Sequence, residues 1–137
     1  MNMLKQLTAD SLQLAGGKVV SFKELIVWQR AMELAQQIYR VSRDFPSSEQ
    51  YGLTSQMRRS AVSIPSNIAE GRKRGTRKDF MQFLRIADGS AAELETQIIL
   101  AGSFYKLPGL ARAHELLIEV QKMLGAMLKK LSLPAAS

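Results

Sequence analysis

Positively charged side chains are concentrated in one short stretch of the chain, residues 53–79, and they point to electrostatic rather than covalent chemistry. The stretch contains two groups of cations, which are Arg58 and Arg59, followed by Arg72, Lys73, Arg74, Arg77 and Lys78. Together with Glu70 and Asp79 they give it a net charge of +5, out of +7 for the whole chain. Cations at this density favour an acidic partner, with nucleic acid ahead of an anionic membrane surface.

Arg77 and Lys78 are the more specific part of this pattern. Thr76, with Asp79 three residues later, forms a capping box that starts a helix, so both cations fall in the first turn. The helix dipole disfavours positive charge there, and unbonded backbone amides already point outward as anion donors. Residues 72–74 lie in the last turn of the preceding helix, where the dipole alone explains cations. We therefore expect a phosphate-binding corner at this junction.

Aromatic side chains are not interleaved with these cations, because Phe80 begins the apolar face of the next helix. Stacking on splayed bases is therefore not expected, and contacts should be mainly with backbone phosphates. Structured RNA, ahead of DNA, is the nucleic acid that we expect to bind, with little sequence preference.

Catalysis and metal binding have little support in the sequence. His114 is the one histidine, and it lies at the edge of an apolar stripe, as a boundary residue does. The carboxylates of Asp88, Glu93 and Glu95 could lie near one another, although exposed acids on a helix explain them as well. No nucleotide-binding glycine motif occurs, and no cysteine is available for thiolate ligands. We expect no catalytic residue, no metal and no cofactor, so the protein is not expected to be an enzyme.

The composition is that of a single globular domain. The chain has 137 residues, of which 46% are hydrophobic, enough for one substantial core. It has neither an apolar run of membrane-spanning length nor the pattern of a secretory signal, which predicts a cytoplasmic location.

Apolar periodicity predicts an all-α fold, an antiparallel up-down-up-down four-helix bundle over residues 21–133. Residues 1–20 lack sustained periodicity and are expected to form a flexible arm. The first two helices are predicted over residues 21–44 and 49–73, the second running through Pro65, and the other two begin after Gly75 and Pro108-Gly109. In the third and fourth helices, apolar residues recur in steps of three and four and so form a continuous apolar seam along one face. These residues are Leu84, Ala87, Ala91, Leu94, Ile98, Ala101 and Tyr105 in the third helix, and Leu110, Ala113, Leu117, Val120, Leu124, Met127 and Leu131 in the fourth. Gly89 and Gly102 lie within the third helix, where each costs about 1 kcal/mol relative to alanine, and we expect close contacts to offset this cost.

The first helix has more apolar surface than a bundle core requires. One stripe contains Trp28, and a second lies beside it, so that the apolar arc spans roughly 200°. Either the helix is sunk deep in a monomer, or the protein self-associates, and we favour self-association.

Pro65 in the second helix removes the backbone bond to the carbonyl of Ala61 and should kink the helix. Asn67 lies near the apolar side and, if buried, must bond the freed backbone or a neighbouring chain. Trp28, Pro65 and Asn67 are therefore the residues expected at an oligomer interface or at the helix kink.

Three segments within residues 22–105 carry a resemblance to a known family: FKELIVWQRAMELA, LTSQMRRSAVSIPSNIAEGRKR and FLRIADGSAAELETQ. The chain resembles the four-helix-bundle family of 23S ribosomal RNA intervening sequence proteins, for which the runs SIPSNIAEG and ADGSAAELE are specific. The resemblance implies a bacterial protein that assembles as a ring-like homopentamer and binds nucleic acid. It also implies a relation to the accessory proteins of diversity-generating retroelements.

The sequence thus favours a non-enzymatic, oligomeric nucleic-acid-binding protein that contacts RNA through phosphates. The alternative is an oligomeric protein-interaction adaptor, such as an accessory factor for a reverse transcriptase. A hydrolase is the third reading, and almost nothing in the sequence supports it.

Overall fold

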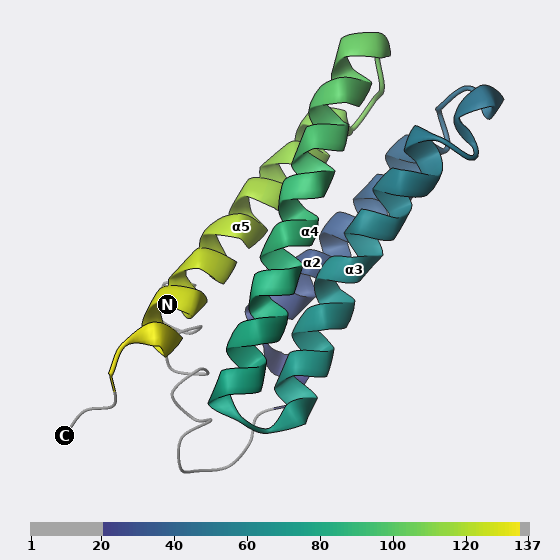
Figure 1. Ribbon diagram of the computed structural model, residues 1–137. Coiled ribbons are helices and arrows are strands. Elements are labelled where there is room, and N and C mark those ends of the chain that lie inside the picture. The colour runs from purple at the N-terminus through teal and green to yellow at the C-terminus, as the bar shows by residue number, and fades with distance from the viewer. Residues whose placement is uncertain (1–20, 135–137) are drawn as a thin grey trace.

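The computed structural model of the protein describes residues 21–134, and within them every regular element is helical (Figure 1). The arm expected at residues 1–20 lies outside the described residues, as do residues 135–137. The elements, in chain order, are the 3-10 turn η2 (Phe22–Glu24), α2 (Ile26–Ser42), the 3-10 turn η3 (Ser47–Glu49), α3 (Leu53–Arg74), α4 (Arg77–Phe104) and α5 (Leu110–Ser132).

The four long helices form an antiparallel up-down-up-down bundle. α2 packs against α3 and α5, and α4 packs against the same two helices, with the most extensive contact between α3 and α4. Short connections join consecutive helices, so α2 and α4 begin at the end of the bundle where α3 and α5 finish (Figure 1). The predicted fold class is confirmed for the described part of the chain.

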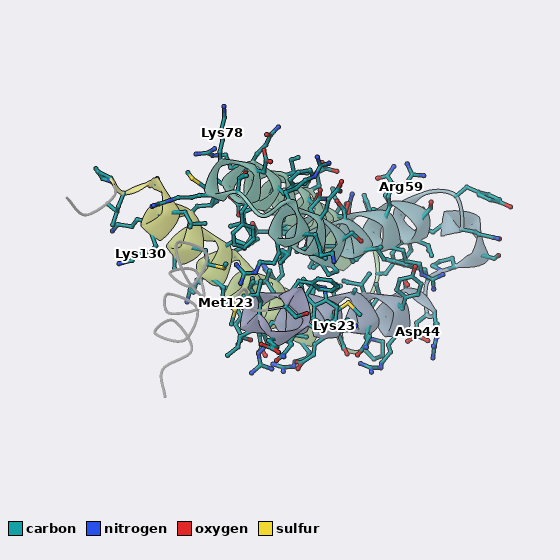
Figure 2. All side chains as sticks on the ribbon, turned by 90° about the horizontal axis from the view of Figure 1, so that it is seen from below. Lys23, Asp44, Arg59, Lys78, Met123 and Lys130 are labelled. Atoms are coloured by element: carbon teal, nitrogen blue, oxygen red, sulfur yellow. The ribbon has the colours of Figure 1, made fainter. Side chains whose placement is uncertain are left out.

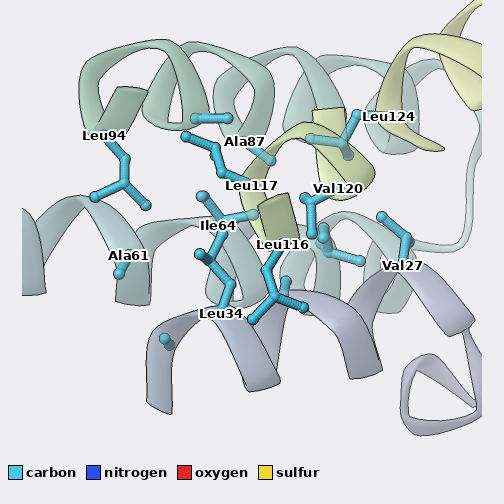
Figure 3. Packing of buried hydrophobic residues seen from close by; sticks show 14 of the residues in the cluster. Val27, Leu34, Ala61, Ile64, Ala87, Leu94, Leu116, Leu117, Val120 and Leu124 are labelled. Carbon is cyan, nitrogen blue, oxygen red and sulfur yellow. The ribbon is translucent and has the colours of Figure 1, made fainter. Parts of the chain in front are cut away.

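The core lies along the predicted seams. In α4 the buried positions follow steps of four and three, and in α5 a wider stripe is buried around Leu117 and Leu124. Leu34 from α2 and Ile64 from α3 meet these side chains in the interior (Figure 3). Each fully buried aliphatic side chain contributes about 1.5 to 3 kcal/mol of transfer free energy, so this shared core holds the four helices together.

The start of the first helix differs from the prediction. The Ser21 hydroxyl caps only the short turn η2, where it accepts from the amide of Lys23 at 3.3 Å. Leu25 then adopts an extended conformation and is fully buried, which breaks the helix before Ile26. The Gln29 side chain donates to the Lys23 carbonyl at 2.9 Å and so ties the turn to α2. Burial of Leu25 thus outweighs a continuous helix at this point.

The hairpin between α3 and α4 follows its predicted signals. Gly75 ends α3 in the left-handed region with φ of 83°, a conformation that glycine adopts without steric cost. The Thr76 hydroxyl accepts from the amide of Asp79 at 3.1 Å and caps α4. Near this end the two helices approach closely, because a Cβ added at Gly71 would lie 2.6 Å from the Cβ of Phe83.

Gly89 and Gly102 do not both have the expected close contacts. A Cβ at Gly102 would meet Leu110 at 3.5 Å, an ordinary contact distance, whereas at Gly89 nothing in the described structure lies within 4 Å. The expectation is therefore wrong for Gly89 within one protomer. This glycine lies exposed in the middle of α4, where it costs about 1 kcal/mol relative to alanine.

Candidate functional site

The two groups of cations lie apart along α3. Arg58 and Arg74 are sixteen residues apart on one continuous helix, and at 1.5 Å per residue this places them about 24 Å apart. Figure 2 shows Arg59 toward one end of the bundle and Lys78 and Lys130 toward the other. The structure therefore does not bring all the predicted residues into one site.

Arg58 is held in place by the neighbouring helix. Its Nε donates to the Ser42 hydroxyl at 2.8 Å, and its guanidinium lies 4.7 Å from the centroid of the Tyr39 ring. A cation near the C-terminus of α2 also interacts favourably with the helix dipole. Arg58 thus stabilises the contact of α2 with α3, while Arg59 beside it is exposed.

Arg72 and Arg74 lie at the C-terminal end of α3 in different environments. Only 3% of the Arg72 surface is exposed, and its guanidinium packs 5.9 Å from the Phe80 ring centroid. Arg74 is exposed, pairs with Glu70 at 3.1 Å and lies 5.1 Å from the Phe83 ring. Arg72 is therefore not part of the accessible surface, because a phosphate would have to displace neighbouring side chains to reach it.

Arg77 caps the C-terminus of α5. Its guanidinium donates to the carbonyls of Leu131 at 2.7 Å, Leu133 at 3.0 Å and Lys130 at 3.3 Å. These carbonyls belong to the negative end of a helix dipole, so a cation beside them is stabilised. The dipole of α4, taken alone, disfavours Arg77 at this position, but the end of α5 lies beside the first turn of α4 and offsets this cost.

A hollow of about 430 Å³ opens beside Arg77, between the start of α4 and the end of α5. Its walls contain the cations Arg77, Lys78 and Arg85, its lining also includes apolar side chains such as Met81, and no acidic residue lines it. The last turn of α5 adds two more cations at this end of the bundle. The basic end, as we call it, comprises Lys73, Arg74, Arg77, Lys78, Arg85, Lys129 and Lys130.

Three members of the basic end were missed in the sequence. Arg85 lies two turns along α4 from Arg77, and Lys129 and Lys130 lie more than fifty residues later in the chain. Only helical spacing could have connected Arg85 to the group, since positions 77, 81 and 85 share one face. For the lysines, the predicted antiparallel bundle places the end of α5 at the same end as the start of α4, but the sequence does not show which side chains meet there.

Trp28 and Pro65 line a second hollow, a groove of about 580 Å³ between α2 and α3. The surplus apolar stripe of α2 faces this groove, and Met32 and Tyr39 lie in it, while the other stripe is buried in the core. Helix α3 continues through Pro65 without interruption and buries it. The wide apolar arc predicted for α2 thus covers both the core and the groove.

Asn67 is bonded within its own helix. Its amide donates to the Ser63 carbonyl at 2.8 Å and to the Ser63 hydroxyl at 3.0 Å, and that hydroxyl is 2.8 Å from the hydroxyl of Ser90 on α4. The carbonyl that Pro65 leaves without its usual donor belongs to Ala61 instead. Asn67 therefore joins a small polar link between α3 and α4 and does not compensate for the proline.

Of the three acids considered in the sequence, Glu95 is the one that pairs with α5. Glu95 accepts from Gln121 at 3.3 Å, and its other oxygen lies 3.5 Å from Nε2 of His114. Across residues 21–134 no three carboxylate or histidine side chains gather closely enough to hold a metal ion. In the same part of the chain no helix is long and apolar enough to cross a membrane.

Comparisons with known proteins agree with this architecture. A family model described as 23S rRNA-intervening sequence protein matches residues 23–126. A solved structure of a protein with unknown function from the S23 ribosomal protein family of Bacteroides thetaiotaomicron VPI-5482 is similar, with a TM-score of 0.67 and 27% sequence identity. That similarity covers 76% of this chain and 99% of the other. No curated protein matches the chain.

Proposed function

The chain belongs to the family of 23S rRNA-intervening sequence proteins, and on this premise we propose that it is a non-enzymatic, self-associating protein that binds RNA through its basic end. The observation that carries the proposal is the convergence of cations from α3, α4 and α5 on one end of the bundle, around a hollow that no acidic side chain lines.

The geometry of the basic end suits phosphate contacts. Lys73, Lys78 and Arg85 are exposed and make no ion pair with another described side chain. The first amides of α4 lie at the same end and attract anions, because their helix dipole is positive there. Arg77 is used for the cap on α5, so it positions this surface and places a positive charge beside the hollow. Binding of this kind follows backbone charge rather than base sequence.

Self-association is the second part of the proposal, and exposed apolar side chains on α4 support it. Ile86, Leu100 and Phe104 are exposed apolar residues of α4, and Phe104 has 65% of its surface exposed. Gly89 lies one turn from Ile86, and a Cβ added at Gly89 would meet nothing within 4 Å, so a second copy can approach the backbone there without meeting a side chain. Several copies would repeat the basic end at fixed spacing and give avidity that one copy lacks. The pentameric ring implied by the family resemblance is one such arrangement.

The dependence of RNA affinity on salt tests the proposal. Fluorescence anisotropy of a labelled RNA measures the association constant at a series of salt concentrations. The logarithm of this constant should fall with the logarithm of the salt concentration, with a slope of about −0.7 per phosphate contacted on single strands and about −0.9 on duplex. Lys78→Gln should reduce the slope by about one phosphate contact, while Lys106→Gln, which removes an exposed lysine from the connection at the opposite end, should leave it unchanged. Equal slopes for both variants and the unaltered protein would exclude the basic end as the binding surface.

An adaptor that grips an acidic or RNA-bearing protein remains the competing function, because the same cations could serve it. Capture of partners on the immobilised protein, with RNA sequenced and proteins identified, separates the two. Recovery of one protein that survives nuclease treatment, with no enriched RNA, would favour the adaptor.

A further inference from the structure

The groove between α2 and α3 combines aromatic rings with a rim of cations. Trp28 and Tyr39 contribute the rings from α2, and the same groove is lined by Arg40, next to Tyr39, and by Arg43, one turn further. Val62 contributes an apolar wall from α3, and no acidic residue lines the groove. This combination could not be recognised in the sequence, because the rings and the wall belong to different helices.

Both aromatic rings are held by contacts outside the groove. The Trp28 ring packs edge-on against Phe22 with centroids 5.4 Å apart. The Tyr39 ring lies 4.7 Å from the guanidinium of Arg58, which is itself fixed by its bond to Ser42. Rings that are already fixed lose little conformational freedom when another planar group stacks on them.

Cations continue the groove at both ends. On α3 the positions 59, 62, 66, 69 and 73 follow one face, and Val62, Ser66 and Ala69 of this set line the groove. Arg59 therefore lies beyond one end of the groove and Lys73 beyond the other, where it joins the basic end. Over fourteen residues at 1.5 Å each this face is about 21 Å long. The groove thus leads from one predicted group of cations to the other.

We propose that this groove holds unpaired bases of single-stranded RNA, stacked on Trp28 and Tyr39, while the arginines at its rim contact the flanking phosphates. The inference rests on the proposed function and adds base contacts to it. The groove volume of about 580 Å³ lies within the range of about 300 to 1,000 Å³ that is usual for ligand sites. Stacking on aromatic side chains inside a positively charged groove is a common way of binding single strands.

Charge favours RNA over a second copy of this chain as the occupant. Arg40 and Arg43 are exposed and make no ion pair with another described side chain, so both are available to an anion. A second copy carries a net charge of +7 and would bring more positive charge to the rim. An RNA strand brings phosphates that can contact these arginines, and its bases have flat faces that can stack on the rings.

Trp28 makes the proposal directly testable, because it is the only tryptophan in the chain. Its fluorescence is followed while the full-length protein is titrated with a single-stranded oligoadenylate of about 12 nucleotides, a length within the usual site size. The control is an abasic oligomer with the same number of phosphates. Stacked bases should quench the emission of Trp28, and the abasic oligomer should bind more weakly without quenching it.

Variants locate the bases independently of the tryptophan. Tyr39→Leu should weaken binding of labelled oligoadenylate by about 5-fold to 100-fold and leave binding of the abasic oligomer unchanged. Tyr51→Leu is the matched control, because Tyr51 is 88% exposed and lies outside the groove. Circular dichroism shows whether each variant is folded. The fluorescence titration uses the unaltered protein, so it tests the proposal even if a variant does not fold.

The outcomes separate this inference from the proposed function. Equal binding of both oligomers, with unchanged Trp28 emission, overturns base stacking but leaves phosphate binding in place. Failure of both oligomers to bind overturns the inference about the groove, whereas the salt dependence of labelled RNA binding still decides the proposed function of the basic end. Emission that changes with protein concentration and not with RNA identifies the groove as a contact between copies, and this also overturns the inference.

Discussion

Arg77 combines two roles that are usually assigned to different residues. Its side chain closes the C-terminus of α5 through three carbonyls, and its charge remains beside the hollow of the basic end. Lys78, the next residue, makes no ion pair with another described side chain. The pair therefore allows the structural and the binding contributions of neighbouring cations to be measured separately.

We predict that Arg77→Gln lowers the free energy of unfolding by about 1 to 2 kcal/mol, because hydrogen bonds from a charged donor to the end of α5 are lost. Lys78→Gln should change it by less than about 0.5 kcal/mol, as expected for an exposed surface position. Urea unfolding at one fixed protein concentration measures both. If Lys78→Gln lowers the stability as much as Arg77→Gln does, then Lys78 and Arg77 both stabilise the contact between α4 and α5.

Tyr105 gives a prediction about alkaline pH. Its hydroxyl donates to Oε2 of Glu49 at 2.7 Å, and this bond raises the pKa of Tyr105 above its ordinary value. The bond therefore stabilises the fold from neutral pH up to the unfolded tyrosine pKa of about 10, and this stabilisation is lost as the pH rises through the folded value. The same Glu49 accepts from the amide of Leu53 at 3.4 Å, so the contact joins the start of α3 to the end of α4.

Comparison with Tyr105→Phe isolates this contribution. The unaltered protein should be more stable than the variant by a constant amount up to a pH of about 9, and the difference should shrink above a pH of about 10. Urea unfolding over a series of pH values measures the difference. If the difference in the free energy of unfolding stays constant or grows at alkaline pH, the hydrogen bond between Tyr105 and Glu49 is not its cause.

At the scale of helices, sequence patterns were informative where one local rule decided the outcome. The seams of α4 and α5 have the steps of four and three that a bundle core requires, and the Thr76 cap and the Gly75 turn follow from residue type. The break at Leu25 could not be predicted, because it depends on burial of that side chain by other helices. Local sequence signals therefore predict where a helix begins and ends when no tertiary contact opposes them.

Two glycines in neighbouring helices should respond to alanine in opposite ways. Gly71→Ala would place a Cβ 2.6 Å from that of Phe83, so we expect a loss of about 1 to 3 kcal/mol of stability from overpacking. Gly89→Ala meets nothing within 4 Å in the described structure, so helix propensity should raise the stability of dilute protein by about 1 kcal/mol. Thermal or urea unfolding of the two variants shows which substitution lowers the stability and which raises it. Two losses of similar size would indicate that Gly89 is already packed against another molecule in dilute solution.

At the scale of the whole molecule, the candidate surfaces were only partly predictable. The sequence identified residues 72–78 as a basic junction, but whether a cation is buried like Arg72, used as a cap like Arg77 or exposed like Lys78 depends on neighbouring helices. Arg85 and the lysines of α5 join the basic end through the fold alone. The α2/α3 groove was likewise hidden, because its rings and its walls are far apart in sequence.

Self-association is the prediction that belongs to the whole molecule. Light scattering on micromolar protein should give a mass that is a multiple of 15.2 kDa. Leu100→Gln should reduce this mass, because it removes an apolar contact from the outer side of α4, whereas Ile118→Gln, a partly exposed apolar position on α5, should not. Dissociation should also weaken RNA binding by about 10-fold or more, since the avidity of repeated basic ends is lost. A mass of 15.2 kDa for the unaltered protein would refute self-association and leave each basic end to act alone.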